Sequence, residues 1–168
     1  MKKIAAFLYG VTSYVIFFVT FLYSVGFVGN LFVPKSIDSL PIGPLGQALL
    51  IDTLLLGLFA LQHSVMARPA FKRWWTRIVP KPVERSTYVL FSSLALIVLF
   101  AYWQPVGGVI WQVQDPTGQA ILLGLCALGW GIVLISTFLI NHFDLFGLRQ
   151  VWLYLRGKEE RALAFVTP

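Results

Sequence analysis

Cysteine and charged residues are both scarce in this sequence. Its one cysteine, Cys126, excludes an intrachain disulfide and a cysteine-based metal cluster. Charged residues make up 12% of the 168 residues, which is about half of the roughly 25% found in average soluble domains. These two shortages exclude an ordinary cytosolic globular domain, a disordered chain and a nucleic-acid binder of the usual kind.

Long apolar runs take the place of the missing charge. Hydrophobic residues make up 58% of the chain, and the mean hydropathy is +0.78. A helix needs about 20 apolar residues to cross a bilayer core about 30 Å thick. Runs of this length predict four transmembrane helices, at about residues 4–28, 45–66, 86–103 and 118–140. We therefore predict an all-α fold, a polytopic membrane helix bundle, with residues 1–168 forming a single membrane domain.

The basic residues indicate on which side of the membrane each loop lies. The net charge is +6, and all of the 13 Lys and Arg residues except Lys35 lie before the first span, between the second and third, or after the fourth. The positive-inside rule places these segments in the cytoplasm. We expect a bacterial inner-membrane protein with both the N-terminus and the C-terminus cytoplasmic. Contact with the lipid bilayer then explains the positive charge, and no nucleic acid is expected as a partner.

The residues after the fourth span have a different pattern. Leucines and a tryptophan recur at helical spacing between residues 145 and 155. This periodicity predicts an interfacial amphipathic helix at about 144–157, lying on the cytoplasmic leaflet. Gly147 is expected to weaken that helix locally.

Polar side chains in or beside the spans are the candidates for chemistry, because burying them in lipid is costly. His63 lies near the cytoplasmic end of the second span, and Asn141 and His142 lie near the same end of the fourth. We expect the two histidines to share a membrane level, where they can meet across the bundle.

Three interpretations of the two histidines remain open. Each imidazole can bond a backbone carbonyl or a lipid phosphate, the pair can line a substrate or cofactor pocket, or it can bind a metal or haem. Asp144 can assist His142. Two histidines without further ligands are a weak metal signal, so no metal site is predicted.

Two other acidic residues have open roles. Asp52, in the outer half of the second span, is either a functional polar group or a boundary acid near the headgroups, and we prefer the second reading. Glu84 is the single acid of the basic loop, beside Arg85 at the entry to the third span. It can pair with a neighbouring cation or face a cationic ligand, and sequence spacing does not choose between these.

Three segments carry a family resemblance: LFALQHSVMAR at 58–68, PVERSTY at 82–88 and NHFDLFGL at 141–148. They resemble the membrane methyltransferases related to methanethiol S-methyltransferase, which belong with the NnrU-like and isoprenylcysteine carboxyl methyltransferase-like proteins. The first and third segments are fairly specific together. The resemblance extends over the whole chain.

The resemblance implies an enzyme that methylates a small thiol, with S-adenosylmethionine as the methyl donor. The expected substrate is methanethiol and the expected product is dimethyl sulfide. In-line displacement at a sulfonium methyl depends on proximity and alignment. The residues expected to line the substrate or cofactor pocket are His63, Glu84, Arg85, Asn141, His142, Asp144 and Arg149.

The sequence also departs from the family pattern. The family continues with an Arg-His-Pro segment that carries most of the cofactor contacts, and no Arg-His-Pro occurs here. We therefore expect a truncated or shortened form. The alternative functions are a non-catalytic NnrU-like membrane protein linked to nitrogen-oxide respiration and a two-histidine haem protein. The sequence does not determine the acceptor thiol or the oligomeric state.

Overall fold

The chain is built from helices throughout the residues that the computed structural model describes, which are 1–40, 42–109 and 111–158. The four long helices are α1 (Lys2–Gly29), α2 (Leu45–Ala67), α4 (Lys81–Tyr102) and α5 (Pro116–Ile140). Each of them is long and apolar enough to cross a membrane. The predicted all-α membrane fold with four spans is confirmed.

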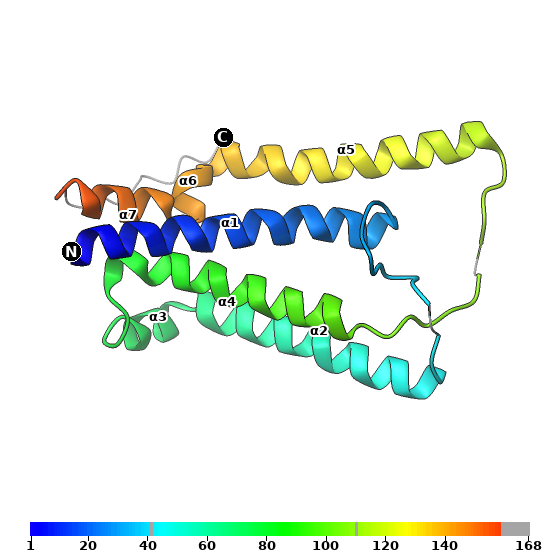
Figure 1. Cartoon of the computed structure of the whole chain (residues 1–168), viewed down its shortest axis with the longest axis horizontal. Coiled ribbons are helices and arrows are strands. Elements are labelled where there is room, and N and C mark those ends of the chain that lie inside the picture. Colours follow the sequence, from blue (N-terminus) through cyan, green and yellow to red (C-terminus); the bar gives the residue numbers. More distant parts are fainter. Residues whose placement is uncertain (41, 110, 159–168) are drawn as a thin grey trace.

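Two short helices, α3 (Pro69–Trp75) and α7 (Leu148–Leu155), lie at one end of the bundle, and a third, α6 (His142–Leu145), lies beside the middle of α1. Figure 1 shows α3, α7, the N-terminus of α1 and the start of α4 together at this end. We call it the basic end, because it carries Lys2, Lys3 and the basic loop 68–85. The basic loop was not expected to contain a helix, and α3 starts there at Pro69, whose fixed φ suits a first helical position.

Helix α4 forms the centre of the bundle, with α1 packed on one side and α2 on the other (Figure 1). Phe27 and Phe100 meet at a ring-centroid distance of 4.8 Å and are both buried. Helix α5 lies apart, with no buried residue along its length. Its Trp130 reaches the Phe21 ring of α1 at 5.6 Å. The polar groups described below therefore lie mainly on the three packed helices and on α6.

Asp52 is buried between α2 and the end of α4, with 5% of its surface exposed. Its Oδ1 accepts a hydrogen bond from the backbone N–H of Gln104 at 2.9 Å, just beyond the last turn of α4. The contact gives the carboxylate a backbone partner, and the reading of Asp52 as a boundary acid near the headgroups stays a prediction. Because α2 already begins at Leu45, the carboxylate lies inside the helix pair and satisfies a backbone donor there.

The single surface helix expected at 144–157 is interrupted at Gly147, which has φ +84°. A Cβ atom at this position would lie 2.6 Å from Ser86 Oγ and 2.7 Å from Ser86 N, so the chain crosses directly over α4. A Cβ atom at Gly10 of α1 would lie 2.6 Å from Val151 of α7. Val151 is 0% exposed. Helix α7 is thus packed into the junction of α1 and α4, and does not lie only on a membrane surface.

Gly147→Ala should destabilise the fold, because the new methyl group meets Ser86 and because an L-residue at positive φ costs about 1–2 kcal/mol before any clash. Thermal unfolding in detergent measures the change. Gly57→Ala is the matched control, since nothing lies within 4 Å of a Cβ atom there and alanine favours a helix interior. Equal melting temperatures for the two variants would contradict this account of Gly147.

Candidate functional site

A small cavity lies between α1, α2 and α4, with Phe146 closing it from the segment after α6. Its volume is about 150 Å³. The walls are mainly apolar and include Phe17, Phe21, Phe59, Val89, Leu96 and Phe146. A water molecule occupies about 30 Å³ of liquid, so the cavity suits a molecule of a few heavy atoms.

A polar cluster of three side chains, His63 of α2 with Tyr88 and Ser92 of α4, opens onto this cavity. The Tyr88 hydroxyl lies 3.0 Å from each ring nitrogen of His63 and can bond one of them at a time. Ser92 Oγ lies 3.3 Å from His63 Nδ1. The His63 ring also stacks on Phe59, with centroids 5.3 Å apart. Because His63 is exposed, the cavity is accessible at the imidazole.

The other hydroxyl groups that line the cavity are already occupied. Thr20, Ser24 and Ser93 each donate to a carbonyl of their own helix, four residues back, at 2.7–2.9 Å. These local bonds satisfy each hydroxyl without a ligand. In contrast, within the part of the chain that the structure describes, the side-chain hydrogen bonds of His63, Tyr88 and Ser92 join these three residues to one another. The polar cluster is therefore the part of the cavity that can act on a guest molecule.

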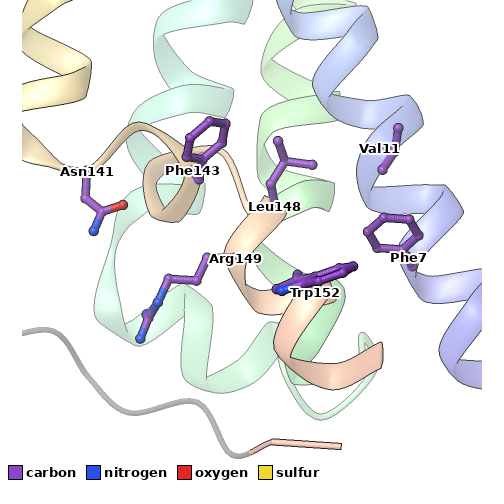
Figure 2. A pocket seen from close by; sticks show the side chains of 7 residues that line it. All are labelled: Phe7, Val11, Asn141, Phe143, Leu148, Arg149 and Trp152. Carbon is purple, nitrogen blue, oxygen red and sulfur yellow. The ribbon is translucent and has the colours of Figure 1, made fainter. Parts of the chain in front are cut away.

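A second and larger recess, a groove of about 510 Å³, lies between α1 and the α6–α7 segment. Figure 2 shows Asn141 and Arg149 on one side of it, and the apolar side chains of Phe7, Val11 and Trp152 on the other. Phe143 and Leu148 complete the lining. This groove combines a broad aromatic surface with a narrow polar margin.

Three predicted site residues meet at the polar margin of the groove. Arg149 donates to Asp144 Oδ1 at 2.8 Å and forms an ion pair with it. Asn141 has φ +135°, a region that few non-glycine residues adopt. Its Oδ1 accepts from the backbone N–H of Asp144 at 3.3 Å and caps α6. The margin thus presents a cation and an anion side by side.

His142 lies in the protein interior, with 2% of its surface exposed. Its Nε2 is 2.8 Å from the Tyr14 hydroxyl of α1, and its Nδ1 is 2.7 Å from Thr137 Oγ1 of α5. Its ring stacks on Phe138 at 4.1 Å. The imidazole is therefore a bridge that joins α5 and α6 to α1.

The partners of His142 fix its tautomer. The Thr137 hydroxyl donates its one hydrogen to the Leu134 carbonyl at 2.6 Å, so Thr137 Oγ1 accepts from Nδ1–H of His142. Nε2 then accepts from the Tyr14 hydroxyl. Burial lowers the pKa of His142 from its ordinary value, since the charged form loses hydration. The neutral imidazole is the form that this bridge accommodates.

The expectation that the two histidines meet across the bundle is wrong. In the described part of the chain, no hydrogen bond or ring contact joins them. Phe146 separates their surroundings, because its ring packs on His142 at 4.8 Å and also lines the cavity beside His63. Both nitrogens of His142 are engaged, which removes the basis for a haem held by the two histidines.

The seven predicted site residues therefore fall into separate places. His63 lines the cavity, Asn141 and Arg149 line the groove with Asp144 paired to Arg149, and His142 is buried between Tyr14 and Thr137. Glu84 and Arg85 are half-buried at the start of α4 and line neither the cavity nor the groove. Sequence reasoning missed Tyr88 and Ser92. Their spacing of four residues, which puts both on one face of a helix, is the signal that points to them.

Comparison with known proteins identifies relatives of this chain. No family model and no solved structure matches the chain. It is 63% identical over 161 residues to methanethiol S-methyltransferase of Crocosphaera subtropica, covering 96% of this chain and 63% of that protein. It is 52% identical over 165 residues to methanethiol S-methyltransferase of Mycobacterium tuberculosis, covering 98% of this chain and 68% of that protein. Nurim of Xenopus laevis is 35% identical over 113 residues, which are 64% of this chain and 39% of that protein. The chain spans about two thirds of the length of the two methyltransferases.

Acid should weaken the His142 bridge. An unfolded chain protonates histidine at a pH of about 6.5, whereas the lowered pKa of His142 keeps the folded protein neutral to lower pH. The unfolded state then binds more protons, so stability falls as the pH drops through 6.5. We expect the melting temperature in detergent to decrease between pH 7.5 and pH 5, and to decrease less in His142→Gln.

The exposed histidine provides the control for this measurement. His63→Gln removes the other histidine and leaves the bridge of Tyr14, His142 and Thr137 intact, so it tests whether the change is specific to His142. The same pH dependence in His142→Gln and in the unmodified protein would show that His142 does not titrate on unfolding.

Proposed function

Because this chain belongs to the methanethiol S-methyltransferase family, we propose that it forms the thiol-binding part of an enzyme that methylates methanethiol to dimethyl sulfide. The chain spans about two thirds of the length of its relatives, so the activity is proposed for the protein that its whole gene encodes. The observation that carries the proposal is the polar cluster of His63, Tyr88 and Ser92 on a cavity of about 150 Å³.

The cavity matches the substrate in size and polarity. Methanethiol has a methyl group and a thiol, and no other polar group. The phenylalanine and leucine walls accept the methyl group, and burial of each such group stabilises binding by about 0.8 kcal/mol. The same walls keep water from competing as the acceptor. A cavity of this kind excludes amino acids and nucleosides.

His63 supplies the base that the reaction requires. A thiolate is the reactive nucleophile, and a thiol is not, so methanethiol must lose its proton. Histidine is the side chain that most often serves as a general base. With Tyr88 or Ser92 bonded to Nδ1, the Nε2 lone pair takes the proton from sulfur. The resulting imidazolium stabilises the thiolate until the sulfur is methylated, and then releases the proton.

We assign part of the binding of S-adenosylmethionine to the groove. That donor has an adenine ring and a zwitterionic amino-acid end, and it supplies a methyl group activated by a positively charged sulfur. We assign the amino-acid end to the Arg149–Asp144 pair with Asn141, since a paired cation and anion complement a zwitterion. Phe143 and Trp152 offer aromatic faces to the adenine. The α6 segment connects the two sites, since Phe143 lines the groove and Phe146 the cavity.

We further propose that the protein lies in the bacterial inner membrane with both termini cytoplasmic. The support is the basic end, which brings together Lys2, Lys3 and the basic loop 68–85. Positive loops stay on the cytoplasmic side. The groove then opens toward the compartment that contains S-adenosylmethionine. Glu84 and Arg85, also at this end, are assigned to the surface charge and not to catalysis.

His63→Gln should lower kcat/KM for dimethyl sulfide formation by about 100-fold or more, the range of general-base catalysis. The protein is expressed in membranes from its whole gene, and headspace dimethyl sulfide is measured with methanethiol and S-adenosylmethionine. Tyr88→Phe should give a smaller loss, since Ser92 still orients the ring. Ser64→Ala, at the exposed neighbour of His63, is the control and should keep full activity.

Two results would count against the proposal in different ways. Full activity in His63→Gln would remove His63 from the mechanism but leave the enzyme. No dimethyl sulfide from the unmodified protein would favour the non-catalytic NnrU-like alternative.

Leu96→Ala should extend the range of thiols, because it enlarges the cavity beside the polar cluster. The ratio of kcat/KM for 1-propanethiol over methanethiol should rise by about 10-fold or more, the discrimination expected for a methylene group in a tight apolar pocket. Competition between the two thiols in one vial measures the ratio directly. An unchanged ratio would mean that this cavity does not select the substrate.

A further inference from the structure

A third recess lies at the basic end and shares no residue with the cavity or the groove. It is a pocket of about 750 Å³ where the start of α1, the loop after α3, the start of α4 and the end of α7 meet. We call it the basic-end pocket. The residues that define its character are Lys2, Tyr9, Trp75, Val83, Phe91 and Tyr154.

The polar groups of the basic-end pocket that lack partners are donors. Trp75 Nε1 is buried and has no hydrogen-bond partner, and an indole N–H can only donate. Two of the hydroxyls at the same place are already used, because Tyr9 donates to Thr87 at 3.0 Å and Thr87 donates to the Val83 carbonyl. Among the residues that the structure describes, no carboxylate lines this pocket. Since buried donors in native proteins nearly always have an acceptor, the missing partner is an acceptor.

The surrounding charge favours an anion as that acceptor. Lys2 lines the pocket, and the ammonium of Lys3 lies 5.9 Å from the ring of Tyr154, another lining residue. The loop that supplies Trp75 contains six basic residues and a single acid, Glu84. A phosphate is the anion that such donors and cations bind well.

The walls of the pocket are apolar, so a free anion would match only part of its lining. Val79, Pro82, Val83 and Phe91 form much of the lining. Trp75 packs near Phe91 and Phe71, with centroids 6.4 Å and 5.7 Å apart. Tryptophan beside basic residues is typical of the headgroup level of a membrane. An occupant with an anionic head and apolar chains matches both the basic residues and the apolar walls of the pocket.

We propose that the basic-end pocket binds an anionic phospholipid. The lipid phosphate accepts the hydrogen bond from Trp75 Nε1 and lies near Lys2, and the first part of an acyl chain lies along Val83 and Phe91. This site is independent of the proposed methyl transfer, because it uses none of the residues assigned to the thiol or the donor.

Native mass spectrometry of the full chain in detergent tests the proposal. Phosphatidylglycerol and phosphatidylcholine of identical acyl chains are added at equal concentration. We expect phosphatidylglycerol to remain bound preferentially. Trp75→Phe keeps the ring and removes the donor, so it should weaken phosphatidylglycerol binding by about ten-fold, the effect of one hydrogen bond to a charged group. Trp74→Phe, at the exposed neighbouring tryptophan, is the control and should bind as the unmodified protein does.

A second variant keeps the test valid if Trp75→Phe folds poorly. Lys2→Glu changes an exposed side chain, and it should also reduce the preference for phosphatidylglycerol. Equal binding of the two lipids to the unmodified protein would overturn the proposal. So would equal affinity of Trp75→Phe and Trp74→Phe, or displacement of the lipid by millimolar inorganic phosphate, which would indicate a simple anion site.

Discussion

The close approach of Gly147 to Ser86 is the constraint on which the rest of the structure depends. The chain can cross α4 at this point only because residue 147 has no side chain and adopts φ +84°. This crossing delivers Val151 onto Gly10 and so fixes α7 between α1 and α4. Helix α6 is then held in place from both ends. Its position determines where Phe146 closes the cavity and where the groove margin forms.

The two histidines show how surroundings decide the chemistry of one residue type. His142 has both nitrogens engaged within 2.8 Å and stacks on Phe138, so it can neither accept a proton easily nor reach a ligand. His63 is exposed, and its partners Tyr88 and Ser92 come from a single neighbouring helix. The first ring is a fixed part of the scaffold, and the second is exposed beside the cavity.

The sequence predicted the helices that follow from long apolar runs. It did not predict the features that depend on contacts between residues far apart in the chain. Four long apolar stretches predict four spans, because lipid imposes one length on each helix. The sequence predicts a local weakness at Gly147, but not the full break, since only the proximity of Ser86 requires a glycine there. In the same way, no pattern in α2 shows that the end of α4 covers Asp52. His63 was predicted from its place in an apolar helix. Tyr88 and Ser92 were missed because polar residues on a half-buried helix resemble ordinary surface residues.

The buried carboxylate of Asp52 has a consequence for how the protein is made. A lone α2 that enters lipid exposes an acid without a partner, which membrane insertion disfavours. The N–H that accommodates this acid belongs to Gln104, 52 residues further along the chain. Pairing of the second and third spans therefore supplies the carboxylate with a donor that α2 alone does not have.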